Sequence, residues 1–167
     1  MKRILNLKVD KAFFQEVKNS HTGRTLPYCY QCGTCSSSCP VADEMDIKPH
    51  EMVELIKIGL KEALAQSKAI WQCSTCYMCT ERCPQGVQLT SIILSLRDIA
   101  MREGVLIPDA VKESCKNLYD TGRLLPLSQF QKDRRMKLQL PDIPQLDTNP
   151  IKGLVNKTRV ANILEVK

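Results

Sequence analysis

The sequence predicts a mainly α-helical protein in which helices surround two cysteine-rich segments. Apolar residues recur at helical spacing in three stretches of the chain: 49–72, 88–103 and 109–120. Pro49 and Pro108 stand where two of these helices would begin, and Gly104 and Gly122 follow the ends of two of them. Aromatic residues make up only 5% of the chain, so the core must be built mainly from aliphatic side chains.

The N-terminal residues predict two short elements. Residues 1–9 alternate loosely between polar and apolar and predict a short edge strand. Asp10 can cap a short helix that follows it. That helix would carry Ala12, Phe13, Phe14 and Val17. Gly23 and Pro27 then break the chain before the first cysteine.

The remaining stretches predict helices that surround the cysteine segments. In residues 49–72 the apolar face contains Met52, Val53, Ile56 and Leu60, and Gly59 is expected to divide the stretch into a longer and a shorter helix. Residues 88–103 give the clearest pattern of one buried face. That face contains Leu89, Ile92, Ile93, Leu96, Ile99 and Ala100.

Beyond Pro126 the pattern changes, and the segment 126–167 shows prolines, basic residues and no sustained period. Its apolar content is high for a disordered segment, which favours an extended tail that orders against a partner. The sequence therefore predicts an N-terminal extension (1–28), a helical cysteine-containing domain (29–125) and an extended partner-binding tail (126–167).

Two identical cysteine motifs carry the chemistry. The first is Cys29-x2-Cys32-x2-Cys35-x3-Cys39-Pro40, and the second is Cys73-x2-Cys76-x2-Cys79-x3-Cys83-Pro84. Each iron of a [4Fe–4S] cubane needs one protein thiolate, and cysteines at i, i+3 and i+6 lie along a turn that can curl around one cube. The repeat therefore predicts two [4Fe–4S] clusters. Two zinc sites are the alternative, but zinc favours two separated cysteine pairs.

The proline after each fourth cysteine disfavours helical geometry at that cysteine and turns the chain away from the loop. In two-cluster ferredoxins the fourth thiolate binds the other cube. That pattern implies the following ligands: Cys29, Cys32, Cys35 and Cys83 for cluster 1, and Cys73, Cys76, Cys79 and Cys39 for cluster 2. Cys115 lies outside both motifs and is interpreted as a small apolar residue, and His21 and His50 as surface or capping residues.

Charge and hydropathy restrict the other classes of function. The formal net charge is +6, but eight thiolates remove eight charges and two cubes of core charge 2+ return four, which leaves about +2. A nucleic-acid partner is therefore not expected. No apolar run approaches the roughly 18–20 residues of a membrane helix, and no secretory signal stands at the N-terminus. We expect a cytoplasmic protein.

The helical segments around the motifs resemble the α-helical ferredoxin domain, found in the iron–sulfur subunit of succinate dehydrogenase and its relatives. The strings YCYQCGTCSSSCPVA and IWQCSTCYMCTERCPQGV resemble the C subunit of heterodisulfide reductase. The KPHEMVELIKIGLKEAL and DTGRLLP segments do so as well, and the resemblance covers residues 1–125.

This resemblance implies a non-catalytic electron-relay subunit of an oxidoreductase complex. In that family, single electrons pass from the flavin-containing A subunit, the site of electron bifurcation coupled to a hydrogenase or formate dehydrogenase. They reach the B subunit, which reduces the CoM-S-S-CoB heterodisulfide in methanogenesis. Related relay subunits occur in sulfur-oxidising heterodisulfide-reductase-like complexes and in other iron–sulfur oxidoreductases. Two further hypotheses are a self-contained enzyme and a nucleic-acid-binding protein that uses clusters structurally; the chain contains no catalytic motif and no Gly-rich nucleotide loop.

Overall fold

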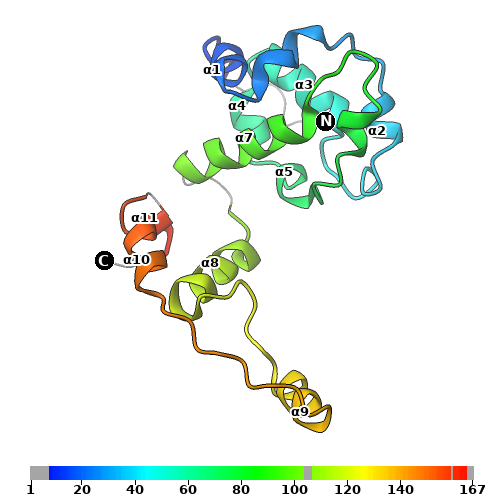
Figure 1. Ribbon diagram of the computed structural model, residues 1–167. Coiled ribbons are helices and arrows are strands. Elements are labelled where there is room, and N and C mark those ends of the chain that lie inside the picture. The colour runs from blue at the N-terminus through cyan, green and yellow to red at the C-terminus, as the bar shows by residue number, and fades with distance from the viewer. Residues whose placement is uncertain (1–7, 104–106, 159, 165–167) are drawn as a thin grey trace. The chain divides into compact units, whose positions relative to one another are not determined.

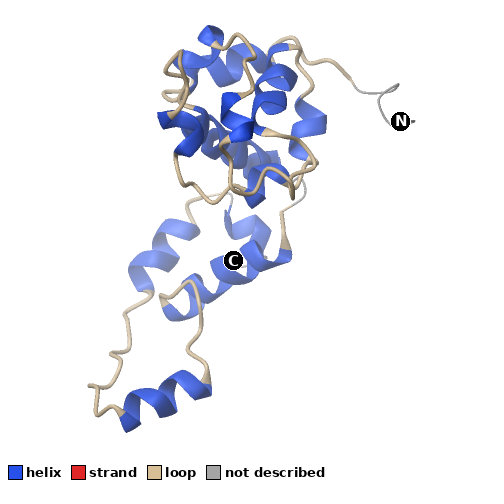
Figure 2. Cartoon of the chain, turned by 90° about the vertical axis from the view of Figure 1, so that its right-hand side faces the viewer, coloured by secondary structure: helices blue, strands red, loops and turns tan. Residues whose placement is uncertain are grey.

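The computed structural model describes residues 8–103, 107–158 and 160–164, and every regular element in these ranges is a helix (Figure 2). The predicted mainly α fold is confirmed. Contacts divide the chain into two compact units, residues 1–106 and 107–167. Both cysteine motifs lie in the first unit, which therefore contains the candidate site.

The first unit is a set of short helices around one long one (Figure 1). In chain order the elements are α1 (Phe13–Asn19), the 3-10 helix η1 (Gly23–Tyr28), α2 (Thr34–Ser37), α3 (Pro49–Lys57), α4 (Lys61–Ala65), α5 (Ala69–Gln72), α6 (Met78–Glu81) and α7 (Leu89–Glu103). Helix α7 contacts α1, η1, α4, α5 and α6. Helix α7 therefore packs against elements from before the first cysteine motif (α1 and η1) and from after it (α4, α5 and α6).

The core of this unit is aliphatic, as the low aromatic content predicts. The predicted face of α7 is buried along its whole length: Leu89, Ile92, Ile93, Leu96, Ile99 and Ala100. Met52, Val53 and Ile56 of α3 are buried against the same cluster, together with Phe13 and Val17 of α1. Burying one such side chain stabilises the fold by roughly 1.5–3 kcal/mol. The buried side chains of these helices form one continuous cluster.

The glycine break inside residues 49–72 is confirmed, because α3 ends at Lys57 and α4 begins at Lys61. Gly59 has a φ of 80°, and its carbonyl accepts a hydrogen bond from the Asp10 N–H at 2.8 Å. The Asp10 carboxylate accepts from the Ala12 N–H at 2.9 Å, but Ala12 itself is the N-cap residue of α1 and no side chain caps this helix, so the predicted Asp10 cap is wrong. Of the strand predicted over residues 1–9, residues 1–7 lie outside the described part of the chain, and residues 8 and 9 belong to no regular element.

The Gly59→Ala substitution should destabilise the first unit. A left-handed backbone costs a non-glycine residue about 1–2 kcal/mol. A Cβ at residue 59 would also lie 2.5 Å from the carbonyl oxygen of Asp10. Gly86 is the matched control, because its φ is also positive (64°) while a Cβ there meets nothing within 4 Å. Thermal unfolding followed by helical circular dichroism should show the larger loss for Gly59→Ala; equal losses would contradict the close contact.

Two sets of hydrogen bonds join distant segments of the first unit. One set links the residues before α3 to the start of α5, and the other links the residue before α7 to η1. The Asp46 carboxylate, just before α3, accepts from the Ser67 hydroxyl at 2.7 Å and from the Ala69 N–H at 3.0 Å, at the start of α5. The Gln88 N–H, just before α7, donates to the Thr25 hydroxyl of η1 at 2.9 Å. The two motifs are therefore held in one framework before any cluster is considered.

The second unit consists of α8 (Asp109–Thr121), α9 (Gln129–Lys137), α10 (Asn149–Val155) and α11 (Val160–Leu164). Helix α8 ends at Gly122, as predicted, with a φ of 71°. Both α10 and α11 contact α8. The sequence pattern groups α8 with the cysteine-containing domain 29–125, whereas its contacts place it with the C-terminal helices in the unit that begins at Ile107.

The segment 126–167 contains helices that the absence of a sustained apolar period did not predict. Ser128 forms a capping box for α9: its hydroxyl accepts from the Gln131 N–H at 3.3 Å, and the Gln131 side chain accepts from the Ser128 N–H at 2.9 Å. The residues that connect α9 to α10 are extended and irregular. Large apolar side chains in this segment stay exposed: Phe130, Met136, Leu138, Leu140, Leu146 and Leu154.

Candidate iron–sulfur site

The two cysteine motifs form loops with the same backbone conformation. We call residues 29–40 the first loop and residues 73–84 the second loop. In the first loop, Gln31 and Gly33 have positive φ values of 64° and 75°. In the second loop, the residues at the same positions, Thr75 and Tyr77, have φ values of 54° and 63°. The sequence repeat is therefore also a repeat of backbone geometry.

The positive φ values strain the backbone of the loops, and the same conformation suits the binding of an anionic ligand. A positive φ is unfavourable for a bulky or β-branched residue, so the left-handed backbone of Tyr77 and Thr75 is strained. Alternating right- and left-handed residues turn successive backbone N–H groups toward one point and create a concavity that binds anions, iron–sulfur centres among them. A cubane of core charge 2+ with four thiolates has a net charge of 2−. The loop backbones therefore fit such a group.

Each loop contains a four-residue helix and ends in a matching turn. Helix α2 follows Gly33 and helix α6 follows Tyr77, and the two short helices contact each other. After the fourth cysteine of each loop, its carbonyl accepts from the N–H three residues later. These bonds join Ala42 N to Cys39 O at 3.3 Å and Gly86 N to Cys83 O at 3.1 Å. The chain turns away from the loop at this cysteine in both halves, as the following proline predicts.

A buried hydroxyl in each loop caps the helix that follows the loop, α3 or α7. The Ser36 hydroxyl accepts from the His50 N–H in the first turn of α3 at 3.0 Å. The Thr80 hydroxyl, at the same position in the second loop, accepts from the Thr90 N–H in the first turn of α7 at 3.1 Å. These hydroxyls satisfy N–H groups that have no partner inside their own helix. They fix each loop to the helix that follows it.

A cation two turns further along each helix holds the first cysteine of the loop. Lys57 of α3 donates to the Cys29 carbonyl at 2.5 Å. Arg97 of α7 donates to the Cys73 carbonyl and, at 2.6 Å, to the Ile70 carbonyl. Lys57 follows His50 by the same seven residues that separate Arg97 from Thr90. Each loop is thus fixed at a hydroxyl and at a cation, and a positive charge lies beside the first cysteine in both.

The structure brings cysteines from both motifs together. One cavity is lined by Cys29, Cys32 and Cys35 of the first loop and by Cys79 and Cys83 of the second. The N–H of Val87 donates to the Cys83 sulfur at 3.3 Å. A cavity bordered by thiols from two segments has the donor set that an iron–sulfur cluster requires.

Cys39, the fourth cysteine of the first loop, lies within electrostatic range of the second loop. Its partial burial raises the pKa of the thiol, and the charges of Cys79, Cys76 and Cys73 raise this pKa further. Burial also raises the pKa of the Cys35 thiol, to about 11, with Cys79 adding to the effect. Without a cation these thiols stay protonated at neutral pH, whereas bound iron stabilises the thiolate.

The second cysteine of each loop, Cys32 or Cys76, reaches the surface, and an exposed tyrosine lies near it in the chain. Tyr30 is 58% exposed and Tyr77 is 45% exposed. The hydroxyl and the N–H of Thr34 lower the pKa of the Cys32 thiol, and the Tyr30 hydroxyl also hydrogen-bonds to this thiol. Both loops therefore have one edge at which an electron could enter or leave.

Comparison with known proteins agrees with this geometry. Residues 25–87 match the 4Fe-4S dicluster domain family. Over 136 residues the chain is 32% identical to the C subunit of the H2:CoB-CoM heterodisulfide,ferredoxin reductase of Methanothermobacter thermautotrophicus, covering 81% of this chain and 72% of that protein. Over 135 residues it is 33% identical to the C subunit of the ferredoxin/F420H2-dependent CoB-CoM heterodisulfide reductase of Methanosarcina acetivorans, covering 79% and 83%.

The chain belongs to the family of heterodisulfide reductase C subunits. The predicted resemblance is therefore confirmed, and the chain is an iron–sulfur protein with a 4Fe-4S dicluster domain. A protein of Archaeoglobus profundus that is described as similar to this C subunit is 28% identical over 136 residues. Relatives named as subunits of reductase complexes support an electron-transfer role within a multi-subunit assembly.

In this C-subunit chain, the remaining candidate residues lie apart from the loops or have a structural role. Cys115 is half-buried on α8 in the second unit, where burial raises the pKa of its thiol. His50 is capped and does not itself cap the helix: the Ser36 hydroxyl accepts from its N–H, and its Nδ1 lies 2.7 Å from the same hydroxyl. No helix among the described residues is long and apolar enough to span a bilayer.

Four residues that fix the loops were not predicted from the sequence: Ser36, Thr80, Lys57 and Arg97. The signal that could have found them is the repeat itself. Ser36 and Thr80 each stand seven residues after the first cysteine of their motif, and each motif is followed by one long helix. Counting from the first cysteine pairs Ser36 with Thr80, and counting from the first residue of α3 and of α7 pairs Lys57 with Arg97.

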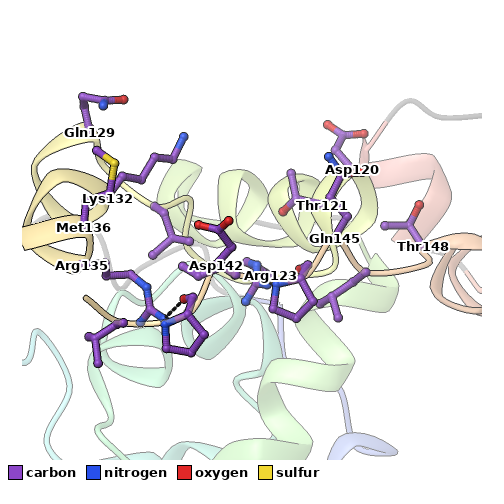
Figure 3. Close-up of a pocket in the computed structure, with 16 residues that line it drawn as sticks. Asp120, Thr121, Arg123, Gln129, Lys132, Arg135, Met136, Asp142, Gln145 and Thr148 are labelled. Carbon is purple, nitrogen blue, oxygen red and sulfur yellow. Dashed lines mark hydrogen bonds between the residues drawn. The ribbon is translucent and has the colours of Figure 1, made fainter. Parts of the chain in front are cut away.

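A groove in the second unit is lined by residues of α8, α9 and the chain that connects α9 to α10 (Figure 3). No cysteine lines it. Arg135 donates to the Pro141 carbonyl at 2.7 Å and Arg123 to the Pro144 carbonyl at 2.9 Å, so both arginines hold the extended chain in place. This groove is therefore separate in chemistry from the thiol-lined site.

Proposed function

We propose that this chain is the electron-relay subunit of a heterodisulfide reductase complex. It holds two [4Fe–4S] clusters and carries single electrons from a flavin-containing A subunit to a catalytic B subunit, which reduces the CoM-S-S-CoB heterodisulfide. The observation that carries the proposal is the structural repeat: two equal cysteine loops lie in one compact unit, and each has one cysteine at the surface. A relay needs one contact edge for its donor and another for its acceptor.

We also propose that the two motifs share their ligands. Cluster 1 takes Cys29, Cys32, Cys35 and Cys83, and cluster 2 takes Cys73, Cys76, Cys79 and Cys39. Support comes from the cavity that Cys83 lines together with cysteines of the first loop, and from the electrostatic effect of the second loop on Cys39. The cation and hydroxyl contacts of each loop keep the thiols in place while electrons pass, so little reorganisation accompanies transfer.

The segment 126–167 is proposed as the part that binds partner subunits. Phe130 and Met136 on α9 are 72% and 66% exposed, which is a high fraction for large apolar side chains. Basic residues lie on the same helix: Lys132, Arg134, Arg135 and Lys137. A partner with a complementary acidic and apolar surface would cover this helix, and the complex belongs in the reducing cytoplasm that keeps its thiols available for iron.

The complex without this chain tests the proposal. From the native host, a tag on the chain should isolate flavin- and iron-containing subunits with it. A complex assembled without the chain should lose heterodisulfide reduction by its physiological donor but keep reduction by a viologen dye that reaches the catalytic subunit directly. Unchanged reduction with the physiological donor would overturn the relay role. Partners that oxidise sulfur compounds would place the chain in a related sulfur-oxidising complex instead.

A further inference from the structure

The two loops can be compared position by position, because a shift of 44 residues superimposes one motif on the other. Features that occur in both halves cannot distinguish the two clusters. The hydroxyls of Ser36 and Thr80 form such a matched pair at this shift, and the cations Lys57 and Arg97 match by their place in α3 and α7 and by their bonds to the carbonyl of a first cysteine. Side chains that bond to cysteine sulfur in only one half can distinguish the clusters.

The first loop supplies side-chain hydrogen bonds to its own sulfurs. The Cys32 sulfur and the Thr34 hydroxyl are 3.3 Å apart, and the Gln31 amide nitrogen lies 3.7 Å from the Cys29 sulfur. A free Cys32 thiol donates to Thr34. A sulfur bound to iron has no proton, so the Thr34 hydroxyl then becomes the donor. Both contacts are with cysteines of the first motif and do not depend on which fourth cysteine completes the cluster.

The second loop lacks these donors at the matching positions. Met78 replaces Thr34 and has no hydrogen-bond donor. Thr75 replaces Gln31, and its hydroxyl donates to the Ser74 carbonyl at 2.7 Å rather than to a sulfur. One side-chain contact favours the second loop, because the Thr90 hydroxyl and the Cys79 sulfur are 3.3 Å apart. Among the described residues, the first half therefore has more side-chain contacts to sulfur, those of Thr34, Gln31 and Tyr30 among them, than the second half, in which Thr90 makes one.

Hydrogen bonds to cluster sulfurs raise the reduction potential, because the added electron makes the group more negative and strengthens each bond. We propose that the cluster bound by the first loop has the higher potential, and that Thr34 is a positioning residue that helps to set the difference. This inference rests on the proposed relay function. A single electron delivered by a reduced flavin or iron–sulfur partner would then rest at the first loop, whose surface edge at Cys32 becomes the exit.

Redox titration of the full, iron-loaded chain, followed by electron paramagnetic resonance, tests the inference. The wild-type chain should be reduced in two one-electron steps. Thr34→Val removes the hydroxyl at nearly constant shape and should shift the more positive step to lower potential while the other step stays. Thr34→Ser keeps the donor and should restore the wild-type value. Met78→Thr adds a hydroxyl to the second loop and should raise the more negative step.

A shift of the more negative step in Thr34→Val would overturn the inference, and so would unchanged steps in both Thr34→Val and Met78→Thr at full iron content. If Thr34→Val fails to load iron, Met78→Thr decides alone: the inference requires that the more negative step rises, and a shift of the other step overturns it. Two reducible clusters in the opposite order would leave the relay function intact, whereas a chain whose clusters accept no electron would remove the relay function itself.

Discussion

Replacing Cys83 with serine should remove the cluster of the first loop, although Cys83 belongs to the second motif. The expectation follows from the cavity that Cys83 shares with Cys29, Cys32 and Cys35. A cube that loses one of its four thiolates binds iron much more weakly, so the iron content should fall from about eight to about four atoms per chain. The reciprocal change, Cys39→Ser, should remove the cluster of the second loop.

Matched substitutions at the first cysteine of each motif show which cluster is lost. The electron paramagnetic resonance spectrum of Cys83→Ser should match that of Cys29→Ser, and the spectrum of Cys39→Ser should match that of Cys73→Ser. The opposite pairing, with Cys83→Ser like Cys73→Ser, would show that each motif binds its own cube. Cys115→Ser is the control for loss of a thiol outside the loops and should keep both signals.

Arg97→Leu should loosen the second loop and shorten the lifetime of its cluster. The guanidinium donates to the carbonyls of Ile70 and Cys73, and these acceptors would lose a charged donor. Hydrogen bonds to charged groups contribute about 1.5–3 kcal/mol each, so a loss of about 2–5 kcal/mol is expected. The measurement is the rate at which cluster absorbance decays in the presence of an iron chelator, together with the thermal midpoint.

Two variants show that the geometry of Arg97 matters and not only its charge. Arg82→Leu removes the same charge from an exposed side chain of the second loop and should change neither the decay rate nor the thermal midpoint. Arg97→Lys keeps the charge but loses the planar fork that reaches the carbonyls of Ile70, Trp71 and Cys73, so it should fall between wild type and Arg97→Leu. Equal decay in Arg97→Leu and Arg82→Leu would mean that the contacts of Arg97 do not hold the loop.

The helices of the first unit could be predicted because their signals are local. Apolar periodicity marked the buried face of α7, and Gly59 marked the break between α3 and α4, just as Gly122 marked the end of α8 in the second unit. Helix α9 was missed because it buries no apolar face and therefore has no period to detect. Its capping box, Ser128 with Gln131, was the available local signal.

The finer parts of the candidate site could not be predicted, because they depend on contacts between distant segments or on backbone states that residue type does not favour. Nothing in a threonine or a tyrosine indicates a positive φ, yet Thr75 and Tyr77 both have one. Lys57 and Arg97 look like ordinary charged residues of amphipathic helices, and only the folded chain places them at cysteine carbonyls. The grouping of α8 with α10 and α11 likewise arises from packing between segments.

The central claim, that two cysteine loops hold two [4Fe–4S] clusters, is tested most directly by counting metal in the purified chain and recording its spectrum after reduction. We expect about eight irons and about eight acid-labile sulfides per chain. We also expect an electron paramagnetic resonance signal from reduced clusters close enough to interact magnetically. About two zinc ions per chain, with no signal after reduction, would contradict the claim.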